Sequence, residues 1–158
     1  MKSGQTARRG IASAPVLAFH LAGEARQRGA CFEAPRDGDA GFDIRAAEEL
    51  MLEPGSQAAV STGLRVAIPS GWVGIVKDRS SMASRRVYTH AGVIDSGYRG
   101  EVRILLSNHG SAPYHIQPGA KIAQMLLVPC ITGCVEVALP EDLGSTERGE
   151  GGFGSTGR

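Results

Sequence analysis

The stretch that decides the fold is residues 92–108, GVIDSGYRGEVRILLSN. In its second half Val102, Ile104 and Leu106 alternate with other residues, and the run ends at an Asn-His-Gly turn. Side chains two residues apart lie on the same face of a strand, so this half predicts a β-strand with one buried face. In the first half Asp95 follows a Val-Ile pair and precedes a Ser-Gly turn, which predicts a carboxylate at the mouth of a hairpin.

The same two-residue period recurs along the chain, and glycine or proline interrupts it about every ten residues. The other alternating apolar sets are Leu17/Phe19/Leu21, Leu64/Val66/Ile68 and Val135/Val137. This pattern predicts an all-β fold, a sandwich or barrel, whose core ends near Pro140. The only helical segment expected is residues 80–85, with Asp78 or Ser80 as its capping residue.

The composition narrows the class of protein. A length of 158 residues with 42% apolar content predicts one globular domain, and a formal net charge of +1 argues against nucleic-acid or membrane-surface binding. Three cysteines without a framework spacing argue against a secreted disulfide scaffold, and we expect a cytoplasmic protein. Residues 1–23 contain no acid, so an export signal is the alternative to a basic tail before the first strand. We favour the tail, because polar residues and a proline interrupt its apolar run.

Two internal stretches have residue types that could carry chemistry. Residues 77–83, KDRSSMA, combine a guanidinium, two hydroxyls and the amides of a short helix, which suits an anion. Asp95 could orient and deprotonate a water molecule, and Tyr98 offers a flat face to a sugar. The alternatives are an ordinary capped turn and a turn aspartate bonded to its own backbone. A third acid, Asp43, lies within a strand-like run and needs a partner, for which Arg45 is the simplest candidate.

The chain ends on RGEGGFGSTGR, residues 148–158, which has no aliphatic side chain for a core. Glycines let backbone amides approach phosphates closely, and Arg148, Ser155 and Thr156 add donors. Phe153 is unusual in such a segment unless it covers a ring. The alternative interpretation is a low-complexity linker.

Five stretches follow one another along the chain, and their sequences are AGFDIRA, RSSMA, GVIDSGYRGEV, GAKIAQ and RGEGGFGSTG. Their order and spacing closely resemble the five motifs of the trimeric dUTPase (deoxyuridine triphosphatase) family, over about three quarters of the 158 residues. The resemblance implies a distorted jelly-roll or β-barrel and hydrolysis of dUTP to dUMP and pyrophosphate with Mg²⁺. It also implies a homotrimer whose active sites lie between subunits. Such an enzyme limits uracil in DNA and supplies dUMP for thymidylate synthesis.

The resemblance assigns roles to residues by their position. Asp95 matches the acid that activates the attacking water, and Tyr98 matches the aromatic residue that packs on deoxyribose. Asp43 matches an acid that holds the metal through water, and Gln124 matches a catalytic residue that contacts the phosphates. The remaining substrate-binding positions are Arg79, Ser80, Ser81, Thr89, His90, Val93, Ile94, Arg103, Arg148, Phe153, Gly154, Ser155 and Thr156.

The resemblance also suggests how the chain is divided. Residues 14–140 are expected to form the β domain, between a flexible basic tail at residues 1–13 and a flexible glycine-rich arm at residues 141–158. The end of this arm would close over the nucleotide, with Phe153 on the uracil ring. A hairpin at about residues 89–93 would read uracil mainly through its backbone.

Several positions depart from the family pattern, and two rival functions remain open at this point. Asp78 stands where proline is usual, Ser81 where glycine is common, Ala120 where an acid is common, and His90 near a position that is often small. One rival is a dCTP deaminase or a bifunctional relative, which needs a glutamate in the strand after the turn. Leu105 occupies that position here. The other rival is a non-catalytic nucleotide-sensing module, which would not need a water-activating acid.

Overall fold

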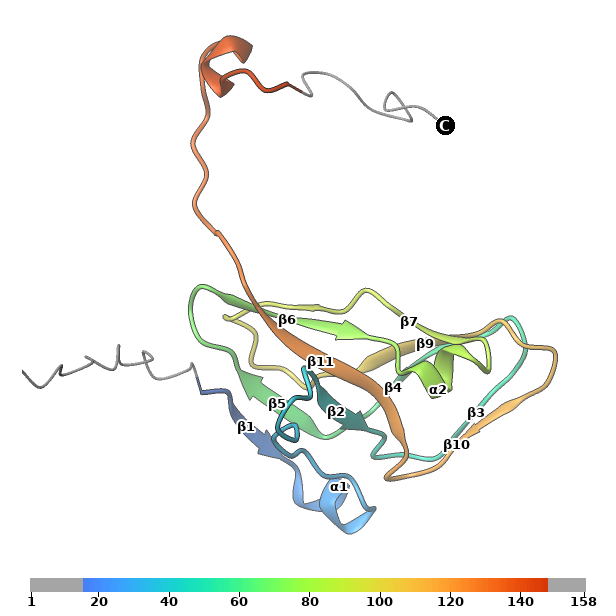
Figure 1. Cartoon of the computed structure of the whole chain (residues 1–158). Coiled ribbons are helices and arrows are strands. Elements are labelled where there is room, and N and C mark those ends of the chain that lie inside the picture. The colour runs from blue at the N-terminus through green and yellow to red at the C-terminus, as the bar shows by residue number, and fades with distance from the viewer. Residues whose placement is uncertain (1–15, 148–158) are drawn as a thin grey trace, which may run out of the picture.

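A computed structural model gives the structure of the protein and describes residues 16–147 (Figure 1). The strands are β1 (Ala18–Leu21), β2 (Phe42–Arg45), β3 (Leu50–Leu52), β4 (Gln57–Val60), β5 (Leu64–Ala67), β6 (Trp72–Lys77), β7 (Val87–His90), β8 (Val93–Ile94), β9 (Ile104–Asn108), β10 (Tyr114–Ile116) and β11 (Lys121–Pro129). The helices are α1 (Gly23–Gln27), α2 (Ser80–Ala83) and the 3₁₀ helix η1 (Pro140–Leu143). The all-β prediction is confirmed. No helix within residues 16–147 is long and apolar enough to span a bilayer.

The strands form four antiparallel sheets. The largest has the order β2-β11-β6-β8, and a three-stranded sheet has the order β4-β9-β7. Two-stranded ribbons, β1-β5 and β10-β3, complete the body. Strand β11 is central to the largest sheet because it pairs with β2 on one side and with β6 on the other. This arrangement of short sheets is jelly-roll-like.

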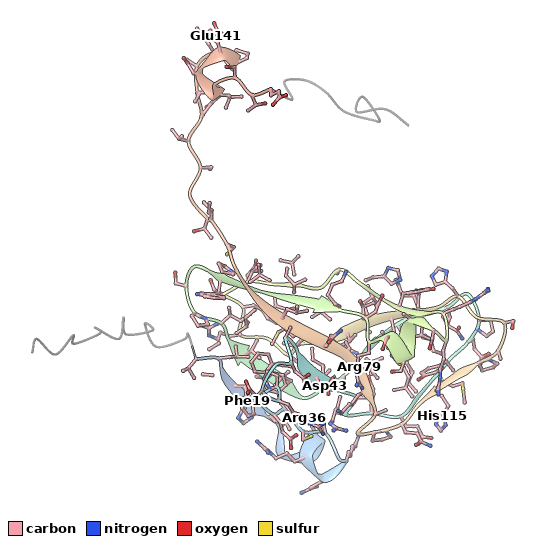
Figure 2. All side chains as sticks on the ribbon, in the orientation of Figure 1. Phe19, Arg36, Asp43, Arg79, His115 and Glu141 are labelled. Atoms are coloured by element: carbon pink, nitrogen blue, oxygen red, sulfur yellow. The ribbon has the colours of Figure 1, made fainter. Side chains whose placement is uncertain are left out.

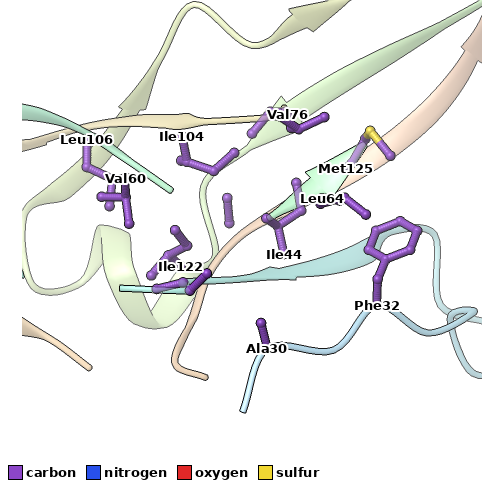
Figure 3. Packing of buried hydrophobic residues seen from close by; sticks show 14 of the residues in the cluster. Ala30, Phe32, Ile44, Val60, Leu64, Val76, Ile104, Leu106, Ile122 and Met125 are labelled. Carbon is purple, nitrogen blue, oxygen red and sulfur yellow. The ribbon is translucent and has the colours of Figure 1, made fainter. Parts of the chain in front are cut away.

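The core lies between the sheets and contains two of the four alternating sets that the sequence predicts, whereas Phe19 of the Leu17/Phe19/Leu21 set is 45% exposed. Leu64, Val66 and Ile68 are buried, as are Val102, Ile104 and Leu106. Figure 3 shows side chains of β2, β5, β9 and β11 meeting in this core. Burying this many aliphatic side chains stabilises the body, at about 25 cal/mol for each Å² of apolar surface removed from water.

The predicted hairpin at residues 89–93 is wrong, because the chain crosses here from one sheet to another. Strand β7 pairs with β9, whereas β8 pairs with β6. Ala91 and Gly92 both have positive φ, 57° and 99°, which turns the chain sharply. The carbonyl of Gly92 then accepts a hydrogen bond of 2.8 Å from the amide of Val76. A side chain at Gly92 would press on Val76, so this crossover requires glycine.

Two other local predictions differ from the structure. Helix α1 was not predicted, because its five residues show no helical period beyond the burial of Ala25. Val135 and Val137 do not lie in a strand, because after β11 the chain leaves the body and no strand within residues 16–147 runs beside it (Figure 1). Ile131 is 95% exposed, Val135 86% and Leu143 77%.

Candidate active site

Asp43 lies at the centre of a cationic site beside the largest sheet. It sits in β2 opposite Gln124 of β11, and both of its oxygens are engaged. Oδ1 lies 3.1 Å from Nε of Arg79, and Oδ2 lies 2.6 Å from Nζ of Lys121. The prediction that Arg45 is the partner of Asp43 is therefore wrong. The guanidinium of Arg45 donates to the carbonyl of Gly119 instead. The prediction that a strand acid needs a partner is confirmed.

A β-bulge explains how Lys121 reaches Asp43. In a regular strand Lys121 and Gln124 would face opposite sides, since they are three residues apart. The pairing of β11 with β2 shifts between Lys121 and Ala123, where two residues of β11 oppose one of β2. The bulge brings both side chains to the same cavity. Sequence reasoning did not assign Lys121 to the site, because nothing in the sequence signals the bulge that brings it beside Asp43.

Around Asp43 the structure forms an open cavity of about 510 Å³. Of the predicted site residues it brings together Asp43, Arg79, Ser80 and Gln124. Sequence reasoning did not assign the other charged side chains that line it, which are Glu33, Arg36, Asp39, Arg45 and Lys121. The cavity thus carries four cationic groups and three carboxylates. Figure 2 shows Arg36, Asp43 and Arg79 gathered in one region. An excess of guanidinium and ammonium groups suits a polyanion such as a phosphate chain.

The turn that carries Arg79 and Ser80 follows β6. Helix α2 is four residues long, shorter than the predicted 80–85, and its N-cap residue is Arg79. The prediction that Asp78 or Ser80 caps this helix is wrong, because no side chain forms a hydrogen bond with the N-terminus of α2. The carboxylate of Asp78 instead accepts hydrogen bonds from Thr89.

Asp95 lies in a second cavity, of about 220 Å³, on the other side of the β6–β8 pair. Its walls include the predicted residues Val93, Ile94, Asp95, Tyr98 and Arg103. Asp95 is exposed at the start of a turn, and its carbonyl accepts a hydrogen bond of 3.1 Å from the amide of Tyr98. A carboxylate in this position is free to contact a ligand or a water molecule.

The ring of Tyr98 is held over the backbone that follows it. Its hydroxyl donates a hydrogen bond of 2.9 Å to the carbonyl of Glu101. A side chain at Gly100 would overlap the Tyr98 ring and hydroxyl, so glycine is what lets the ring lie there. Tyr98 remains 43% exposed, which leaves it accessible to a ligand.

Within one chain the two cavities are separate. Asp95 follows Ile94, which pairs with Gly74, whereas Gln124 pairs with Lys77 further along β6. At about 3.3 Å per residue, the four residues from Val73 to Lys77 separate the levels of Asp95 and Gln124 by about 13 Å. No described residue lines both cavities. Asp95 and Gln124 of the same chain therefore face separate cavities.

Glu101 ties the Asp95 turn to the loop between β4 and β5. Its Oε1 accepts hydrogen bonds from Oγ of Ser61 (2.6 Å) and from the amides of Thr62 (3.0 Å) and Gly63 (2.7 Å). Burial raises the pKa of Glu101, but these bonds and the charge of Arg103 outweigh it and hold the pKa below the usual 4.5. A carboxylate stabilised in this way strengthens the fold while it is ionised.

We expect Glu101→Gln to lower the free energy of unfolding by about 1 kcal/mol at neutral pH, because an amide oxygen accepts these bonds more weakly. The folded-state pKa lies below the unfolded one, so the advantage of the wild type is complete above pH 4.5. The difference in unfolding free energy between wild type and Glu101→Gln should shrink as the pH falls through the folded-state pKa. Urea unfolding across this pH range measures the difference, with Glu53→Gln as the control. A difference that stays constant with pH would contradict the role of Glu101.

Three predicted substrate-binding residues lie outside both cavities. Ser81 is exposed on α2, Thr89 bonds Asp78, and His90 bonds the hydroxyl of Ser107 through Nε2. The predicted residues of the C-terminal arm lie outside the described residues, namely Arg148, Phe153, Gly154, Ser155 and Thr156. Their roles stay predictions.

Comparison with known proteins identifies the family. A family model described as dUTPase matches residues 28–157. The deoxyuridine 5'-triphosphate nucleotidohydrolase of Anaeromyxobacter sp. is 48% identical over 138 residues, covering 84% of this chain and 92% of that protein. The enzyme of the same name from Cutibacterium acnes is 46% identical over 124 residues, covering 76% and 80%.

Solved structures agree with the sequence comparisons. The dUTPase of Staphylococcus bacteriophage 80alpha with dUPNHPP aligns with a TM-score of 0.80 and 31% identity, over 90% of this chain and 99% of that one. A mutant dUTPase from phage phi11 of S. aureus, described with a structural Mg(II) ion, aligns at 0.71 and 29% identity over 80% and 99%. Both align with the jelly-roll-like body described above. The chain belongs to the dUTPase family.

Proposed function

We propose that this protein hydrolyses dUTP to dUMP and pyrophosphate by attack of water on the α-phosphate. The observation that carries the proposal is the exposed carboxylate of Asp95, held beside the ring of Tyr98 in one cavity. The cavity around Asp43, with its excess of cations, provides a place for a phosphate chain. Membership of the dUTPase family over residues 28–157 supports the same reaction. In this role the enzyme limits uracil in DNA and supplies dUMP for thymidylate synthesis.

Each residue has a limited task in this reaction. Asp95 orients a water molecule in line with the α-phosphorus and accepts its proton. Tyr98 packs on deoxyribose and leaves no room for a 2′-hydroxyl. Arg79, Ser80 and Gln124 hold the phosphate oxygens, so that positioning and electrostatics supply most of the rate enhancement. His90, Thr89 and the backbone up to Val93 remain the proposed contacts to uracil, and Ser81 and Arg103 remain proposed contacts to substrate.

The residues around Asp43 fit Mg²⁺ that arrives with the nucleotide. Within residues 16–147 no group of three or more His, Cys, Asp or Glu side chains could hold a metal ion alone. Mg²⁺ usually keeps several waters and takes its other ligands from substrate phosphates and one or two carboxylates. Both Asp43 oxygens already contact cations, so Asp43 suits a contact through water. When bound, the ion would offset the negative charge of the phosphates and fix the conformation of the triphosphate.

We propose a homotrimer with shared active sites on the family resemblance, and the separation of the two cavities supports the sharing of sites. If Asp95 and Gln124 of one chain cannot reach one phosphorus, each site needs Asp95 from one subunit and the Asp43 cavity from another. The exposed apolar residues of 131–143 suit burial against a neighbouring subunit. We further propose that the arm at the C-terminus completes each site, and that the protein acts in the cytoplasm.

Mixing two inactive variants tests the shared site. We expect Asp95→Asn and Arg79→Ala chains to be nearly inactive alone, and to regain activity when they are refolded together in equal amounts. Random assembly leaves about one quarter of the sites with both groups intact, so about one quarter of the wild-type turnover should return. Mixing two batches of Asp95→Asn is the control. A mixture that stays inactive would show that both groups act within one chain.

The direct test gives the purified protein dUTP, dCTP and dTTP with Mg²⁺ and follows both pyrophosphate and the base. We expect pyrophosphate from dUTP, with uracil unchanged. Conversion of a cytosine base to uracil would instead support the deaminase. That reaction lacks its acid here, because Leu105 of β9 stands where the deaminases carry their glutamate. Tight binding of dUTP without turnover would support the nucleotide-sensing module.

A further inference from the structure

Asp78 is a carboxylate placed at the rim of the cationic cavity, between the end of β6 and the start of α2. Its neighbour Arg79 lines that cavity. A negative charge so close to a phosphate site opposes the binding of an anion. The negative charge of Asp78 therefore weakens the binding of an anion in this cavity. The hydrogen bonds of Asp78 indicate which structural role offsets this loss of binding.

The side chain of Asp78 anchors β7. Its Oδ1 accepts two hydrogen bonds from Thr89, one of 2.6 Å from the amide and one of 2.7 Å from the hydroxyl. Both are bonds to an ionised acceptor, which are shorter and stronger than bonds between neutral groups. They join the corner after β6 to a strand of the neighbouring sheet, since β7 pairs with β9. The corner is thus fixed from a second side.

The backbone of Asp78 orients Gln124. Its carbonyl accepts a hydrogen bond of 2.9 Å from Nε2 of Gln124. A carbonyl can only accept, so the amide must present its NH₂ group to Asp78. One N–H is used in this bond, and the second N–H is left to donate to a phosphate oxygen. The orientation of Gln124 therefore depends on where the Asp78 backbone lies.

We propose that Asp78 is a positioning residue that holds Arg79 and Gln124 in register by tying the corner after β6 to Thr89. This inference rests on the proposed function. In this role Asp78 acts through its two hydrogen bonds with Thr89 and does not contact the nucleotide. The charge itself is unfavourable for substrate, whereas its hydrogen bonds fix the groups that bind substrate.

Two substitutions at Asp78 separate geometry from charge. Asp78→Ala removes both anchoring bonds, and kcat/KM for dUTP should fall about tenfold in protein that is fully folded. Asp78→Asn keeps an oxygen acceptor and removes the charge, so kcat should stay within about twofold of wild type and KM should be equal or lower. Glu53→Ala, an exposed carboxylate in the turn between β3 and β4, is the matched control. Unchanged kinetics in Asp78→Ala, or equal damage in Asp78→Asn, would overturn the inference.

A double-mutant cycle with Thr89→Val measures the anchor itself. If the two residues act together, Asp78→Ala should cost less activity in the Thr89→Val background than in the wild type. Strictly additive losses would overturn the coupling. Amide hydrogen exchange gives a reading that does not depend on turnover: the Thr89 amide should exchange at least about tenfold faster in Asp78→Ala. If the wild type failed to hydrolyse dUTP, the proposed function would fall, while this exchange would still decide whether Asp78 holds β7.

Discussion

Replacing Asp95 by asparagine should reduce turnover of dUTP by about a thousandfold while the nucleotide still binds, because the amide cannot accept the proton of the attacking water. The two side chains have nearly the same shape, and Asp95 is exposed at a turn, so the fold should not change. Release of pyrophosphate measures turnover, and calorimetry with dUTP measures binding.

Asp37→Asn provides the matched control for this experiment. Asp37 is an exposed aspartate in a turn, and its own side chain lines neither cavity. Its turnover should equal that of the wild type. If Asp95→Asn kept substantial activity, Asp95 would not be the base. If it lost binding together with turnover, Asp95 would serve to hold the substrate.

Deleting residues 148–158 should lower kcat/KM by about a hundredfold and leave the stability of the body unchanged. The segment supplies the proposed ring cover of Phe153 and the donors of Arg148, Ser155 and Thr156, whose loss exposes the reaction to water. Every described residue, and hence the whole apolar core, is retained in the shortened chain. Turnover of dUTP and thermal unfolding should be measured on the same preparation.

A composition-matched control keeps the length of the arm but replaces residues 148–158 with a Gly-Ser sequence, and it should be as slow as the deletion. A truncated protein that unfolds at a much lower temperature would indicate that these residues stabilise the body. Wild-type rates in the truncated protein would indicate a linker, the alternative that the composition alone leaves open.

The strand pattern was readable from the sequence where the strand packs within the body of the chain. The sets at Leu64 and at Val102 are buried as their two-residue period predicts. The pattern at Val135 and Val137 is equally regular, yet these residues lie beyond the last strand of the body. A two-residue period reports that a segment suits a sheet face, but it does not say which chain provides that face.

The site was less predictable than the fold, because it depends on pairings between distant segments. The identity of Asp43, Arg79 and Gln124 as one group followed from their motifs, and the structure brings them together. The participation of Lys121 depends on a bulge, and the crossover at Gly92 depends on two positive φ angles. Neither feature leaves a periodic signal in the sequence. The separation of Asp95 from Gln124 appears only once β8 and β11 are placed along β6.

The segment after β11 has a consequence for the life of the protein in a cell. In the proposed trimer, a newly made subunit would present Ile131, Val135, Leu139 and Leu143 to water until it meets others. Chaperones and proteases bind exposed apolar segments of this kind, so unassembled subunits should be cleared faster than assembled ones.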